Sequence, residues 1–94
     1  MIAGFADKAT ETLFHSRRPP RRFPPDLVPA ALRKLDMLNA ATSLLEMRSP
    51  PSNRLELLKG PLAGKYSIRI NDQWRLVFLW SDGEASQVQV VDYR

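Results

Sequence analysis

The chain has 94 residues, of which 44% are hydrophobic and 26% charged, which is typical of one small globular domain with a single modest core. It contains no cysteine and one histidine, His15, so disulfides, thiolate metal sites, cysteine nucleophiles and two-histidine nuclease mechanisms are excluded. Fourteen Lys and Arg residues face ten Asp and Glu, and the resulting net charge of +4 indicates either a phosphate-rich or acidic partner or an inert basic surface.

The N-terminal half is predicted to be mainly helical. Its first residues lack the basic-then-apolar order of a secretory signal, and the chain has no apolar run near the roughly 20 residues that cross a bilayer. Apolar residues at helical spacing and the four prolines of SRRPPRRFPP set the boundaries of the elements. The expected order is a candidate strand at 1–5, a helix at 7–15 capped by Asp7, an extended connection at 16–25, a helix at 26–41 with a further turn at 42–47, and a loop at 48–53.

The last third alternates between apolar and polar residues, as strands with one buried face do. The predicted strands are 65–71, 74–80 and 87–93, separated by turns at Asn71-Asp72 and at Ser81-Asp82-Gly83, with a further candidate strand at 55–58. The whole chain, 1–94, is therefore predicted to be a single α+β domain. In it, a small antiparallel β-sheet carries the N-terminal helices packed on one face.

The register of the sheet follows from keeping its apolar residues on one face. It pairs Ile68 with Leu76, and this sets Arg69 directly opposite Arg75 on the face away from the helices. The same reasoning pairs Phe78 with Val88 and Leu76 with Val90, and it places Tyr93 diagonal to Arg75.

Two arginines that face each other across a sheet repel, and a bound phosphate would turn that repulsion into attraction. The alternative is that Asp72, Asp92 or Glu56 neutralises the pair, or that both side chains extend into water. The cation Lys59 and the hydroxyl of Tyr93, both expected nearby, favour a phosphate site. By contrast, His15 is interpreted as a surface or packing residue and Trp74 and Trp80 as core residues.

Four stretches together carry a family resemblance that covers nearly the whole chain. They are PPSNRLELLKGPLAGKYSIRINDQWRLVF (50–78), the terminal VVDYR, IAGFADKATETLF (2–14) and ALRKLDMLNAATSLLEM (31–47). The LKG and NDQWR motifs, in that order and followed by Asp-Tyr, resemble the HigB-type toxins of the RelE/ParE superfamily, which belong to bacterial type II toxin–antitoxin systems. The fold that this resemblance implies agrees with the one predicted from the residues.

The resemblance implies a function as well. Its members are cytoplasmic, ribosome-dependent mRNA endonucleases that need no metal or other cofactor, and a cognate helix-turn-helix antitoxin neutralises them and represses the shared operon. The ribose 2′-hydroxyl attacks the adjacent phosphate, so the site needs a proton acceptor, cations for the developing charge and a proton donor. By position, Lys59, Arg75, Tyr93 and Arg94 are the implied catalytic residues, and Arg54, Arg69 and Glu56 the substrate-binding ones.

Two departures from the family pattern concern the proton transfer. Many relatives have histidine where this chain has Arg94, and some have histidine before LKG, where this chain has Glu56 and Leu57. Proton transfer would then fall to Glu56, to Tyr93 or to the ribosome, because arginine is not a base at neutral pH. The alternatives to an mRNA endonuclease are a non-enzymatic, ParE-like toxin that binds DNA gyrase, and a basic module that binds only an antitoxin or nucleic acid.

Overall fold

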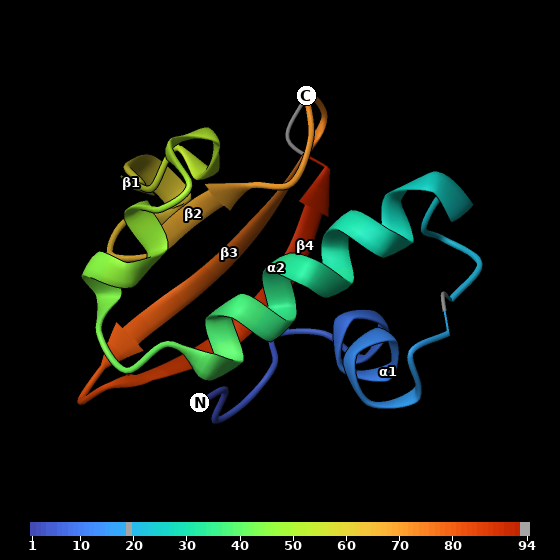
Figure 1. The fold of residues 1–94 in the computed structure, drawn as a ribbon, viewed down its shortest axis with the longest axis horizontal. Helices are drawn as coiled ribbons and strands as arrows, with labels where there is room; N and C mark the ends of the chain where they lie inside the picture. Colours follow the sequence, from blue (N-terminus) through green and yellow to red (C-terminus); the bar gives the residue numbers. More distant parts are fainter. Residues whose placement is uncertain (19, 93–94) are drawn as a thin grey trace.

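The computed structural model describes residues 1–18 and 20–92, and it has helices on one face of an antiparallel sheet (Figure 1). The sheet has the strand order β1-β2-β3-β4, which confirms the predicted α+β class. No helix in the described part of the chain is long and apolar enough to span a membrane. The elements are α1 (Lys8–Ser16), η1 (Pro25–Leu27), α2 (Val28–Ala40), η2 (Leu44–Arg48), η3 (Pro51–Asn53), β1 (Glu56–Leu57), η4 (Gly60–Leu62), β2 (Tyr66–Arg69), β3 (Trp74–Ser81) and β4 (Glu84–Asp92).

The first α-helix begins where the sequence predicts, whereas the helix predicted from residue 26 starts as the 3-10 helix η1 and becomes α-helical only at Val28. The carboxylate of Asp7 accepts a hydrogen bond of 2.8 Å from the Thr10 amide and so caps α1, as expected. Pro29 lies in the first turn of α2, where its missing amide removes no helical hydrogen bond. The guanidinium of Arg17, just after α1, donates to both carboxylate oxygens of Asp36 at 2.9 and 2.6 Å and thereby joins the two helices.

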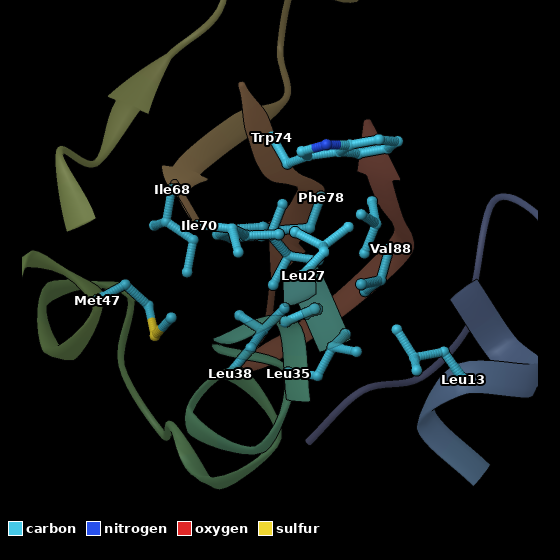
Figure 2. Packing of buried hydrophobic residues seen from close by; sticks show 14 of the residues in the cluster. Leu13, Leu27, Leu35, Leu38, Met47, Ile68, Ile70, Trp74, Phe78 and Val88 are labelled. Carbon is cyan, nitrogen blue, oxygen red and sulfur yellow. The ribbon is translucent and has the colours of Figure 1, made fainter. Parts of the chain in front are cut away.

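The core lies between α2 and the inner face of the sheet, which is the face that the helices cover (Figure 2). From α2, Leu35 and Leu38 are fully buried, and Phe78 and Val88 meet them from the sheet. Trp74 is 8% exposed and its ring lies edge-on to Phe23 at 5.7 Å, which confirms it as a core residue. Trp80 is partly buried against the same cluster. The helix-covered face thus takes most of the large apolar residues, while the outer face carries the polar side chains of β2 together with Val77 of β3.

The predicted register of the central strands is confirmed. Ile68 pairs with Leu76, Arg69 with Arg75, and Leu76 with Val90. The predicted pairing of Phe78 with Val88 is wrong, because the register of the β3–β4 ladder shifts between Val77 and Leu79. The apolar face therefore fixes the register wherever the ladder is regular.

The last strand is longer than predicted because it contains a bulge. It begins at Glu84 rather than at residue 87, and Gln87 has a positive φ of 49°. The extra residue lets Ala85 and Val88, three positions apart, both reach the buried inner face. A strict two-residue alternation loses phase at that point, which is why the sequence pattern placed the start of the strand too late.

Two other short segments differ from their predictions. Residues 1–5 do not form a strand of their own; they follow the free edge of β4 through isolated parallel bridges, Ile2 to Ala85 and Phe5 to Val88. The candidate strand at 55–58 shortens to β1, because only Glu56 and Leu57 pair with β2. The further helical turn predicted at 42–47 is instead the 3-10 helix η2.

A capping box holds the start of η2. The Glu46 carboxylate accepts hydrogen bonds from the Thr42 amide and hydroxyl at 2.9 and 2.8 Å and from the Ser43 amide at 2.9 Å. The hydrogen bonds from Thr42, reinforced by the one from Ser43, lower the pKa of Glu46 below its ordinary value of 4.5. A carboxyl group whose pKa is lowered by folding stabilises the fold above its unfolded pKa, and this contribution is lost as the pH falls.

We therefore expect Glu46→Gln to lower the free energy of unfolding at pH 7 and to change it less at pH 3, because the stabilisation from a carboxyl group whose pKa is lowered by folding is lost as the pH falls. Urea denaturation of both proteins at the two pH values measures this. Glu84→Gln, which removes an exposed charge at the start of β4, is the control. An equal loss of stability at pH 3 and pH 7 would contradict the ionised capping box.

Candidate functional site

A pocket of about 270 Å³ opens on the outer face of the sheet, near the turn between β2 and β3. Its lining consists of three arginines, one aspartate and one asparagine: Arg54, Arg69, Arg75, Asp72 and Asn71. The strand alternation explains how two of the arginines come there. Ile68 and Leu76 point into the core, so their neighbours Arg69 and Arg75 point outward, directly opposite each other.

The two facing arginines each hold a carboxylate. The Arg75 Nη1 lies 2.9 Å from Glu56 Oε1, and its Nη2 donates at 2.9 Å to the backbone carbonyl of Arg54. Arg69 is ion-paired with Asp72. The neutralisation by Glu56 and Asp72 that the sequence left open as an alternative is therefore present. Because three arginines face these two carboxylates, the pocket and Glu56 together keep a net positive charge.

A buried asparagine positions Arg54. Asn53 is fully buried between α2 and η2, and its Nδ2 donates to the carbonyls of Met47 at 3.0 Å and Ser49 at 3.3 Å. Its Oδ1 accepts a hydrogen bond from Lys34. These contacts anchor the loop, and Arg54 follows directly with a left-handed backbone, φ 48°. The third arginine thus reaches the pocket from a loop that is fixed to α2.

A second asparagine shapes the opposite side of the pocket. Asn71 Oδ1 accepts hydrogen bonds from the amides of Gln73 and Trp74, both at 2.9 Å, and so closes the β2–β3 turn. Gln73 Nε2 donates to Asp92 Oδ2 at 2.9 Å, which ties this turn to the end of β4.

With this geometry established, comparisons with known proteins identify the family. A family model for the RelE-like toxin of type II toxin-antitoxin system HigB matches residues 3–94. The chain belongs to this HigB-like toxin family. It is 42% identical to Toxin HigB-1 of Vibrio cholerae over 85 residues, which is 90% of each chain. It is also 39% identical to an uncharacterised protein of Haemophilus influenzae over 67 residues, 71% of this chain and 66% of that protein.

Solved structures agree with the family in fold. Two structures of the YoeB-YefM complex of Staphylococcus aureus match with TM-scores of 0.56 and 0.57, at 17% and 20% sequence identity. Each match covers 100% of this chain and 98% of the other. The family assignment, together with this fold, makes the chain the toxin component of a type II toxin–antitoxin system.

The structure brings together four of the seven site residues predicted for the HigB-like toxin. Arg54, Arg69 and Arg75 line the pocket, and Glu56 contacts Arg75. Lys59 is exposed two residues after β1 and is not among the residues that line the pocket. Tyr93 and Arg94 lie outside the described residues, so their predicted roles stay predictions.

Two site residues, Asn53 and Asn71, were missed from the sequence. Asn71 carried a usable signal, because asparagine before Asp in a turn between two strands often bonds its own backbone two residues on. Asn53 carried none, since its burial depends on α2 and η2 folding over it. His15, set aside from the sequence, is exposed on α1 with its ring against Phe5 at 5.7 Å and Phe14 at 5.3 Å.

Proposed function

We propose that this HigB-like toxin is a ribosome-dependent, metal-independent mRNA endonuclease and that its outer-face pocket binds the scissile phosphate. One observation carries the proposal: three arginine side chains converge on a pocket of about 270 Å³, two of them paired directly across the sheet. The facing arginines, which pair with Asp72 and Glu56 in the free protein, can both turn to a phosphate, which a guanidinium group binds in two places at once.

The proposed chemistry assigns a role to each predicted residue. The ribose 2′-hydroxyl attacks the adjacent phosphate, and Arg69 and Arg75, with Lys59 and Arg54, stabilise the charge that develops on the phosphate oxygens. Arg94 is a further fixed cation at the phosphate. Tyr93 orients the substrate or passes a proton to the leaving 5′ oxygen. Glu56 takes the proton from the 2′-hydroxyl, with Tyr93 and the ribosome as the other candidates for that step.

The direct test is translation in a cell-free bacterial extract. The purified toxin should stop protein synthesis, and mapping of the 5′ ends of the mRNA should show cuts that appear only when ribosomes are translating. If DNA gyrase loses supercoiling activity while the mRNA stays intact, the ParE-like alternative holds. If neither reaction responds, the chain is a binding module.

The proposed partner is a cognate helix-turn-helix antitoxin in the cytoplasm. In the complex of the two proteins, the antitoxin and not the toxin would contact operator DNA. The support is the family assignment and the two matched structures, which are toxin–antitoxin complexes by their titles. A toxin with a net charge of +4 should be recognised by a surface of opposite charge.

We expect the association rate with the antitoxin to fall by about tenfold or more between 50 mM and 0.5 M salt, because ions screen the attraction that steers the two proteins together. Stopped-flow mixing with a fluorescently labelled antitoxin measures the rate, and the dissociation rate should change much less. An association rate that does not depend on salt would exclude electrostatic steering.

A further inference from the structure

A buried serine hydroxyl lies on the outer face of the sheet, beside the arginine pocket. Ser67 is fully buried in β2, and its Oγ has no hydrogen-bond partner within residues 1–18 and 20–92. Buried polar groups almost always have a partner, so one without a partner needs an explanation. Ile68 points into the core, so Ser67 points to the outer face, the same face as Arg69 and Arg75.

The register shows what lies over this hydroxyl. Ser67 sits directly between Glu56 on β1 and Val77 on β3. The ion pair between Arg75 on β3 and Glu56 on β1 must therefore cross β2 on the outer face, beside Ser67. The Arg75 side chain is only 12% exposed, as expected for a chain that lies along the sheet rather than extending into water. Arg75 thus helps to cover Ser67.

We propose that the Ser67 hydroxyl is a phosphate-binding group of the same site, covered by Arg75 in the free toxin and uncovered when Arg75 turns to the substrate. This inference rests on the proposed function of the outer-face pocket. A phosphate that enters between Arg69 and Arg75 competes with Glu56 and with the Arg54 carbonyl for the Arg75 guanidinium. As Arg75 shifts to the phosphate, the space above Ser67 opens and the hydroxyl donates to a phosphate oxygen.

The proposal explains why a serine occupies this position. In the free protein the buried hydroxyl destabilises the fold, because it loses its hydrogen bond to water on burial and none of the described residues replaces that bond. An alanine there would avoid that loss with nearly the same volume. A serine is favoured only if its hydroxyl gains a partner in another state, and the arginine pocket beside it makes an anionic oxygen the fitting one.

Ser67→Ala tests the proposal because it should raise the stability of the free protein and weaken its binding of phosphate. The free variant should melt roughly 4–8 °C higher, since it removes an unsatisfied buried group. Its dissociation constant for a phosphate should rise about tenfold, which is the loss of one hydrogen bond to a charged group. NMR titration with inorganic phosphate, and with an RNA trinucleotide whose 2′-hydroxyls are methylated so that it cannot be cut, measures binding. Ser86→Ala is the control, because Ser86 lies on the outer face of β4, away from the pocket.

Each outcome of these measurements either supports or overturns the proposal. Higher stability with weaker binding of both probes, absent in Ser86→Ala, supports the proposal. Unchanged binding overturns it, because the hydroxyl is then only a flaw in the fold, and lower stability overturns it as well, because the hydroxyl then has a partner in the free protein. The proposed function is tested separately with Arg69→Ala. If that variant binds phosphate as well as the parent, the pocket itself is not the phosphate site.

Discussion

Replacement of Arg75 by alanine should abolish growth inhibition and slow ribosome-dependent mRNA cleavage by roughly 100- to 1,000-fold, the usual effect of removing one group that stabilises transition-state charge. Arg75 contacts or faces the other charged residues of the site. It lies opposite Arg69, pairs with Glu56 and donates a hydrogen bond to the Arg54 carbonyl. Its loss removes a bidentate phosphate ligand and lowers the charge of the pocket by one. Plating assays and single-round cleavage of mRNA on stalled ribosomes measure the two effects.

The fold should survive this change. Repulsion from Arg69, expected from the register alone, is offset by Glu56 and Asp72, so its relief gains little. Glu56 is about half exposed and remains hydrated without its partner, so the loss of the ion pair itself should lower the free energy of unfolding by no more than about 1 kcal/mol. Arg33→Ala, which removes an exposed arginine from α2, is the control and should stay toxic. A folded, fully toxic Arg75→Ala protein would remove Arg75 from the site.

The prediction about Arg75 was reachable from the sequence because strand geometry is periodic. Once Ile68 and Leu76 are assigned to the core, the positions of Arg69 and Arg75 follow with no further information. What the sequence did not reveal depends on departures from that period or on contacts between distant segments. The bulge at Gln87 shifts the alternation of β4 by one residue, and the isolated bridges of residues 1–5 need β4 as a template.

The site residues also divide into those that strand periodicity predicts and those that depend on contacts between distant segments. Arg69 and Arg75 lie in regular strands and could be placed, whereas Arg54 reaches the pocket through a loop held by the buried Asn53. The sequence offered Glu56, Asp72 and Asp92 equally as partners for the arginines. The structure distributes them: Glu56 goes to Arg75, Asp72 to Arg69, and Asp92 contacts Gln73. Which carboxylate pairs with which arginine depends on how far each side chain extends across the neighbouring strands, and the spacing of residues in the sequence does not determine this.

Replacement of Glu56, the carboxylate that pairs with Arg75, should also have a large effect. We expect Glu56→Gln to bind phosphate more tightly and yet to cleave mRNA at least 100-fold more slowly. Binding should tighten by about two- to tenfold, because the carboxylate that competes with phosphate for Arg75 loses its charge. Cleavage should slow because a glutamine cannot accept the proton of the 2′-hydroxyl, and general base help is typically worth roughly 100- to 10,000-fold.

Tighter binding with slower cleavage would show that Glu56 has two roles. In the free protein it competes with phosphate for Arg75, and in the reaction it accepts the proton of the 2′-hydroxyl. Asp72→Asn is the matched control, since Asp72 pairs with Arg69 as Glu56 pairs with Arg75. It should also tighten phosphate binding, but it should raise the cleavage rate, because it frees a cation and removes no base. NMR titration with inorganic phosphate and single-round cleavage on the ribosome supply both numbers for each variant. If Glu56→Gln cleaves faster, as Asp72→Asn should, Glu56 only restrains Arg75, and the proton goes to Tyr93 or to the ribosome.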